Sequence, residues 1–172
     1  MNNDMKILTT YIEALPDKPV DVVAAIKELG IEYIEAFLNG RSGMIERIEN
    51  SSRYRITVNS SDSMTRKRFT AAHELGHYLF HRDLFNKKHI DSNIYSLERD
   101  DVVLADGERS LRPKHEIQAN KFAANFLMPP KIVYELKRQG IVDSARLSKI
   151  FKVSEAAMRV RLGTYERPAA SI

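Results

Sequence analysis

Apolar residues recur along this chain with two periods, one typical of helices and one typical of strands. Residues 20–29 (VDVVAAIKEL) repeat apolar side chains at helical spacing, with Pro19 before them and Gly30 after them. Residues 64–81 predict a longer helix, because the SSDS stretch at 60–63 offers several N-cap residues.

Three segments between these helices read as strands. Residues 31–37 (IEYIEAF) and 54–59 (YRITVN) alternate apolar and polar side chains, as half-buried strands do, and 43–48 (GMIERI) lies between them. The turn-forming stretches NGRSG and NSS separate the three segments. The sequence therefore predicts a small antiparallel meander over residues 31–59.

The second half of the chain begins with a charged, weakly periodic stretch at 83–113 that reads as a long surface excursion. A second strong helix follows in KHEIQANKFAANFLM, and Pro129 and Pro130 end it. Three shorter helices are predicted after it, at 131–139, 143–150 and 154–163. We expect a first domain over 1–130 and a helical C-terminal subdomain over 131–172.

Composition narrows the class of protein. Of 172 residues, 43% are hydrophobic, so the chain can form a substantial core. It contains no cysteine, which excludes disulfides, thiolate metal sites and cysteine catalysis. The N-terminus resembles no signal peptide, and no apolar run approaches the length of a membrane span. We expect a cytoplasmic protein without membrane contact.

The net charge of +4 is unevenly distributed. Residues 131–172 hold 9 basic and 4 acidic side chains, whereas residues 1–130 are close to neutral. A basic C-terminal segment could face nucleic acid or an acidic partner. A solvated surface is the simpler explanation, and it is favoured.

The HELGH stretch carries the candidate chemistry. His73 and His77 are four residues apart, so on a helix both imidazoles project from one face and can share a metal ion. Glu74 is rotated by about 100° around the axis, which lets its carboxylate approach the open side of that metal. Two ligands and a general base on one helical turn are the pattern of a zinc hydrolase.

The register of this helix places both histidines on an apolar stripe. The stripe comprises Phe69, Ala72, His73, Gly76, His77 and Phe80. Buried imidazoles without partners are costly, and a metal removes that cost. Gly76 costs about 1 kcal/mol relative to alanine inside a helix. It therefore suggests close approach of another backbone, either a substrate-binding edge strand or a tightly packed helix.

The third metal ligand stays open on residue patterns alone. His81 lies about 12 Å along the helix axis from His73 and is too distant to be a ligand. Glu116, His115 and the acids of the excursion remain. Glu116 begins the face that Asn120 continues, but an acid in the first helical turn also has a simpler role beside the helix dipole.

The stretches RFTAAHELGHYLFH and EIQANKFAANFLMP together resemble the ImmA/IrrE family of bacterial metallopeptidases. The resemblance implies zinc held by His73, His77 and Glu116, with Glu74 as the catalytic base. In zincins with a glutamate ligand, an acid one turn after that glutamate often braces a zinc-binding histidine, and Asn120, an amide, is the candidate for this role here. The implied fold class is α+β, a minimal zincin-like fold in which a small antiparallel sheet packs on an active-site helix and a glutamate-bearing helix. A helix-turn-helix-like segment is expected at the C-terminus.

The function implied by this resemblance is zinc-dependent endopeptidase activity on a regulatory protein. The expected substrate is a helix-turn-helix repressor of a mobile element or stress operon. The strand 54–59 directly precedes the active helix and is the expected edge for an extended substrate. His115, Tyr78 and Arg112 are candidates for stabilising the oxyanion of the reaction, although a surface or packing role is favoured for each.

A function of another class stays open. Residues 147–166 outline two short helices around a KVS turn, and the second offers Arg159 and Arg161 as candidate nucleic-acid contacts. The alternative is a DNA- or protein-binding transcriptional regulator that keeps the metallopeptidase fold. A helical subdomain that packs on the peptidase, or receives its substrate, is favoured over nucleic-acid binding.

Overall fold

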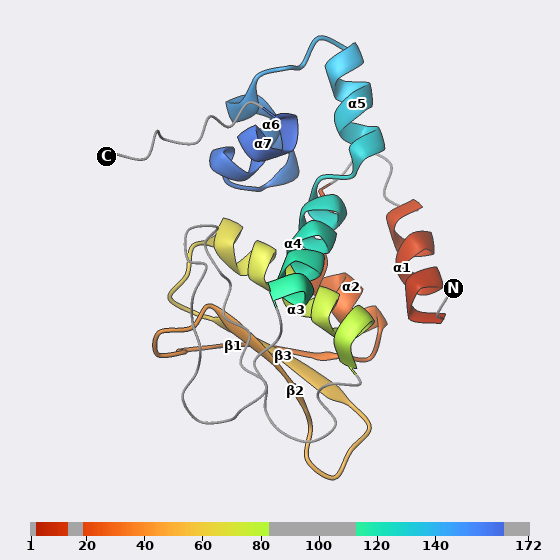
Figure 1. The fold of residues 1–172 in the computed structure, drawn as a ribbon, viewed down its shortest axis with the longest axis vertical. Helices are drawn as coiled ribbons and strands as arrows, with labels where there is room; N and C mark the ends of the chain where they lie inside the picture. Colours follow the sequence, from red (N-terminus) through yellow and green to blue (C-terminus); the bar gives the residue numbers. More distant parts are fainter. Residues whose placement is uncertain (1–2, 14–18, 83–112, 164–172) are drawn as a thin grey trace.

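A computed structural model describes residues 3–13, 19–82 and 113–163 of the chain (Figure 1). These residues form an α+β fold, as the sequence predicted. The first helices and the strands are α1 Asn3–Glu13, α2 Val22–Glu28, β1 Glu32–Ala36, β2 Gly43–Arg47 and β3 Tyr54–Asn59. The remaining helices are α3 Met64–His81, α4 Pro113–Leu127, α5 Pro130–Arg138, α6 Ser144–Phe151 and α7 Glu155–Leu162. Helix α1 is an element that the sequence patterns did not predict.

The sheet differs from the predicted meander. Its strand order is β1-β3-β2, with β1 parallel to β3 and β2 antiparallel to β3. The expected antiparallel meander is therefore wrong, because the third strand lies between the first two. One consequence concerns the expected substrate-binding edge at 54–59. That strand is β3, which is hydrogen-bonded on both sides and cannot accept a further strand.

The side chain of Asn59 holds the β1–β2 loop in place over the end of β3. The loop between β1 and β2 crosses the end of β3, and the Asn59 amide donates to Leu38 O and Arg41 O of this loop at 2.8 Å each. The backbone N–H of Ser60 donates to Ala36 O at 2.8 Å. These bonds satisfy loop groups that a simple hairpin would pair within itself. The stretch NGRSG therefore belongs to a crossover and not to a hairpin turn.

Helix α3 is the central element of the fold. Ser63 caps its N-terminus, where its hydroxyl accepts a hydrogen bond from Arg66 N at 3.3 Å. The helix contacts β2 and β3 on one side and α4 on the other, and Figure 1 shows both helices over one face of the sheet. All ten residues from Thr70 to Leu79 are buried, so the helix is enclosed on all faces and not along one stripe. Phe80, predicted for that stripe, is 40% exposed.

Gly76 marks the place where α3 and α4 meet. A Cβ atom built on Gly76 would lie 3.1 Å from Ala119 Cα and 3.1 Å from Phe122 Cδ1. Of the two explanations offered by the sequence, tight helix packing is therefore the right one. The backbone that approaches Gly76 belongs to α4 and not to an edge strand.

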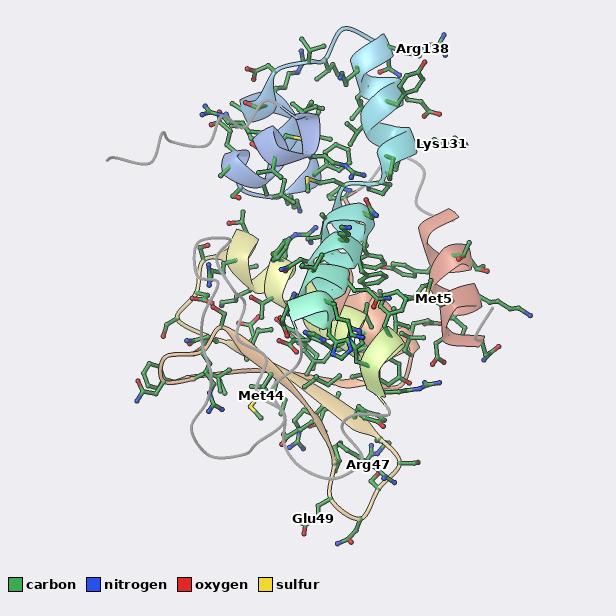
Figure 2. All side chains as sticks on the ribbon, in the orientation of Figure 1. Met5, Met44, Arg47, Glu49, Lys131 and Arg138 are labelled. Atoms are coloured by element: carbon green, nitrogen blue, oxygen red, sulfur yellow. The ribbon has the colours of Figure 1, made fainter. Side chains whose placement is uncertain are left out.

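The sheet presents its apolar face to these helices. Gly43 and Ile45 of β2 pair with Val58 and Ile56 of β3, and all four residues are buried. Met44 lies on the opposite face of the sheet, as strand alternation requires (Figure 2). This arrangement places the first residue of β2 directly against α3.

The three C-terminal helices occupy the predicted positions and lie beyond the end of α4, away from the sheet (Figure 1). Hydrogen bonds link them to the rest of the fold. Arg161 of α7 donates to Asn125 Oδ1 and Met128 O, at 2.9 and 2.8 Å. Arg68 of α3 donates to Lys152 O at 3.1 Å. The division into domains 1–130 and 131–172 stays a prediction.

Some expectations fall outside the described residues. The excursion at 83–112 and Arg112 are among them. Within the described ranges, no helix combines the length and apolar character needed to cross a bilayer.

Candidate metal centre

Three buried side chains from helices α3 and α4 lie close together. His73 and His77 come from α3 and Glu116 comes from the first turn of α4, and one ligand atom from each lies within 4.8 Å of the others. The two Nε2 atoms are 2.9 Å apart. Glu116 Oε2 lies 3.2 Å from His73 Nε2, and its Oε1 lies 3.3 Å from His77 Nε2. Glu116 is only 3% exposed, and from its place in the first turn of α4 its carboxylate reaches both imidazoles.

The spacing of these donors fits a small divalent metal. Ligand atoms about 2.0–2.1 Å from a tetrahedral zinc lie about 3.3 Å from one another. The separation of the two Nε2 atoms, 2.9 Å, is near that value, and each Glu116 oxygen lies at a similar distance from one of them, 3.2 and 3.3 Å. Two imidazoles and a carboxylate also form the donor set of hydrolytic zinc sites, which keep a fourth position open. Metal binding by this group is therefore chemically reasonable.

The electrostatics of the group follow from its enclosure. Burial acts to raise the pKa of Glu116, but the imidazoles of His73 and His77 outweigh it and lower that pKa to about 2. Burial acts to lower the pKa of His73, but Glu116 and Glu74 outweigh it and raise that pKa. For His77 burial dominates and the pKa is lowered. Glu116 is thus a carboxylate at neutral pH, and the lowered pKa of His77 favours its neutral imidazole, the forms in which each binds metal. The raised pKa of His73 favours a proton that a metal would have to displace.

Each histidine of the group has a hydrogen-bond partner on its other ring nitrogen. His73 Nδ1 donates to Asn120 Oδ1 at 2.9 Å, one helical turn after Glu116. His77 Nδ1 lies 3.0 Å from Nδ1 of His81. His81 Nε2 lies 3.2 Å from Gln118 Oε1. Burial lowers the pKa of His81 to about 4, so its imidazole is neutral at neutral pH.

The contact between His81 and His77 was not predicted from the sequence. His81 is absent from the group of three, in agreement with its expected exclusion as a ligand. Its i, i+4 spacing from His77 was nevertheless a usable signal, because such residues are neighbours on a helix surface. Gln118 carried no comparable signal, since it approaches His81 only through the packing of α4 on α3.

Glu74 is fully buried next to the three-residue group, on the side facing the sheet. A Cβ atom built on Gly43 of β2 would lie 3.3 Å from Glu74 Oε1 and would overlap the methyl group of Thr70. The overlap with Thr70 therefore favours glycine where β2 passes this carboxylate. Sequence patterns placed Gly43 where the NGRSG turn meets the segment 43–48 and gave no sign of this contact.

The expected oxyanion candidates have other surroundings. The Tyr78 hydroxyl accepts a hydrogen bond from Arg82 at 3.4 Å. The Tyr78 ring packs edge-on against the ring of Tyr54, with 5.2 Å between the two ring centroids. The ring centroid of His115 lies 4.5 Å from the ring centroid of His81. Neither residue belongs to the three-residue group.

The two arginines considered for nucleic-acid contact are both engaged within the protein. Arg159 pairs with Glu155 on the same helix at 2.6 Å. Arg161 reaches the end of α4, where it donates to Asn125 Oδ1 and to the carbonyl oxygen of Met128, the residue after the helix. The exposed basic side chains of this region include Lys131 and Arg138 on α5 (Figure 2).

Comparison with known proteins agrees with this geometry. No curated protein matches the chain closely enough to count as a relative. The family model of Peptidase_M78, described as the IrrE N-terminal-like domain, matches residues 26–163. The match covers both α3 and α4, and with them the whole His-His-Glu group. The chain therefore belongs to the Peptidase_M78 family of IrrE N-terminal-like domains, a metallopeptidase family.

Proposed function

We propose that this protein is a zinc-dependent endopeptidase in which His73, His77 and Glu116 hold the metal and Glu74 is the general base. The main support is the buried His-His-Glu group with ligand spacing, in a chain of a peptidase family. Contacts among these three groups offset part of the cost of burying them, but they give the fully buried Glu74 no role. Metal binding gives Glu74 a function.

The surrounding side chains prepare His73 for this role. Asn120 accepts a hydrogen bond from His73 Nδ1, which fixes the proton there and leaves the Nε2 lone pair for a metal. An amide orients the ring without adding a second negative charge beside Glu116. Asn120 is therefore a positioning residue in this proposal.

Glu74 acts in proton transfer. A bound zinc ion would lower the pKa of a water molecule and polarise the scissile carbonyl group. Glu74 accepts the proton of the attacking water and later delivers it to the leaving amine. Its enclosure beside Gly43 limits the positions that the carboxylate can adopt.

The outer edge of β2 is the proposed place for an extended substrate, in place of 54–59. Strand β2 pairs with β3 on one side, and its other side carries no strand among the described residues. Because Gly43 of this strand contacts Glu74, a peptide added to that edge would bring its backbone near the general base. Main-chain hydrogen bonds to the edge would align the scissile bond.

The substrate class rests on the resemblance of the two motifs to the ImmA/IrrE family. We propose a cytoplasmic regulatory protein, with a helix-turn-helix repressor of a mobile element or stress operon as the first candidate. The alternative of a transcriptional regulator that contacts DNA through Arg159 and Arg161 is less favoured. Arg161 is already hydrogen-bonded to α4, and such a regulator has no evident use for Glu74.

Cleavage of the neighbouring gene's product tests the proposal. The purified protein is incubated with that product in the presence of zinc and, separately, with a chelator, and the fragments are identified by mass spectrometry. We expect zinc-dependent cleavage by the wild type and none by Glu74→Gln, which should still bind zinc. Cleavage by Glu74→Gln at the wild-type rate would overturn the assignment of the general base. Absence of zinc binding by the wild type would overturn the metal site.

A further inference from the structure

A chain of hydrogen bonds, here called the relay, leads from His77 through His81 to Gln118, away from the other two residues of the metal centre. His77 Nδ1 and His81 Nδ1 are 3.0 Å apart, and His81 Nε2 is 3.2 Å from Gln118 Oε1. His81 is 5% exposed and lies one turn after His77 on α3. Gln118 belongs to α4, so the relay joins the two helices that carry the metal ligands.

Metal binding through Nε2 of His77 would determine which ring nitrogen carries the proton in each histidine of this relay. If His77 uses Nε2 for the metal, the proton of its neutral ring is on Nδ1. That N–H donates to His81 Nδ1, which must then carry the lone pair. The His81 proton is consequently on Nε2, where it donates to the carbonyl oxygen of Gln118. Every donor in the chain meets an acceptor, and the relay ends on a neutral amide.

We propose that His81, supported by Gln118, is the positioning residue that fixes the tautomer and orientation of His77 for metal binding. This inference rests on the proposed metal site. It deepens that proposal by giving His81, which is not a ligand, a specific task. The two histidines are thus oriented in parallel ways, His73 directly by Asn120 and His77 through His81.

The relay also explains how the metal centre depends on helix packing. Glu116, Gln118 and Asn120 all belong to one turn of α4, and each contacts a histidine of α3. Docking of α4 therefore supplies the third ligand and both terminal amide acceptors together. Loss of His81 would leave the Nδ1–H of a buried ligand without its acceptor, which favours rotation of the ring or the wrong tautomer.

The test compares two substitutions of His81 by zinc affinity. His81→Leu removes the acceptor, whereas His81→Asn keeps an oxygen at the same number of bonds from Cβ as Nδ1. Zinc dissociation constants are measured by competition with a chromogenic chelator. We expect a loss of about 10- to 100-fold for His81→Leu, and at least partial recovery for His81→Asn. Cobalt(II) bound to each variant reports the ligand geometry through its visible absorption bands, which should change in His81→Leu and return in His81→Asn.

Further measurements separate positioning from general damage. Thermal unfolding of the metal-free variants shows whether the fold is intact. If His81→Leu does not fold, Gln118→Leu tests the relay from its other end. In a relay, Gln118→Leu should weaken zinc binding in the wild type and have little further effect in the His81→Leu background. Wild-type zinc affinity in a well-folded His81→Leu, or equal weakness of His81→Asn and His81→Leu, would overturn the relay. Failure of the wild type to bind zinc would instead overturn the proposed function.

Discussion

Gly43 of β2 packs beside Glu74 of α3 at a position where the neighbouring atoms, Thr70 above all, leave little room for a side chain. A Cβ atom there would lie 3.3 Å from Glu74 Oε1 and 3.2 Å from Thr57 O, and would overlap Thr70. The glycine brings an edge strand of the sheet into contact with the proposed general base. This contact links the fold of the sheet to the chemistry of the helix.

Substitution of Gly43 should impair catalysis more than metal binding. In Gly43→Ala the added methyl group pushes β2 away from α3 and displaces both Glu74 and the substrate edge. A misplacement of about 1 Å can cost on the order of 100-fold in rate, so we expect a large fall in kcat/KM with zinc affinity nearly unchanged. Gly40→Asn is the matched control, because position 40 is open and its φ of +72° suits asparagine. Wild-type activity of Gly43→Ala would contradict this role of the contact.

Removal of the Glu116 carboxylate should weaken zinc binding strongly. Glu116→Gln preserves the shape of the side chain but takes the negative charge from the metal ligands. We expect the zinc dissociation constant, measured by calorimetric titration, to rise by more than the factor of about 10–100 typical of outer-shell changes. Asn120→Ala should fall within that smaller range. Equal zinc affinity of Glu116→Gln and the wild type would exclude Glu116 as the third ligand.

The contact of α3 with α4 at Gly76 should make this position intolerant of larger residues. In Gly76→Val the side chain would press against Ala119 and Phe122, and overpacking of this kind costs about 1–3 kcal/mol. The free energy of unfolding is measured with urea on the metal-free protein. Ala156→Val on α7 serves as control, because it introduces the same residue at an exposed helical position. A stability of Gly76→Val equal to that of the control would show that α4 can move away without cost.

Arg161 should contribute to stability and not to nucleic-acid binding. Arg161→Ala removes hydrogen bonds to Asn125 Oδ1 and Met128 O and should lower the free energy of unfolding by about 1–3 kcal/mol. Arg159→Ala should change stability little, because its pair with Glu155 is exposed. Binding to duplex DNA is measured at two salt concentrations for each variant. Strong, salt-dependent binding lost in both variants would favour the regulator over the peptidase.

Much of the candidate site was predictable from local spacing. The i, i+4 separation of His73 and His77 fixed both on one helical face, and Ser63 marked where that helix begins. The same rule placed Asn120 one turn after Glu116. Such relations depend only on helix geometry, which a dozen neighbouring residues determine. For that reason the helices from α2 to α7 were found close to their observed bounds.

Only the tertiary structure decided relations between distant residues. The β1–β2 loop passes over the end of β3, where Asn59 binds two of its carbonyl groups, although a turn signal in that loop pointed to a hairpin. Gly43 meets Glu74, and His81 meets Gln118, because whole elements pack together. The sequence by itself determined which residues share a helical face. The docking of α3 between β2 and α4 determined which of those faces meet, because packing depends on shapes that no local pattern records.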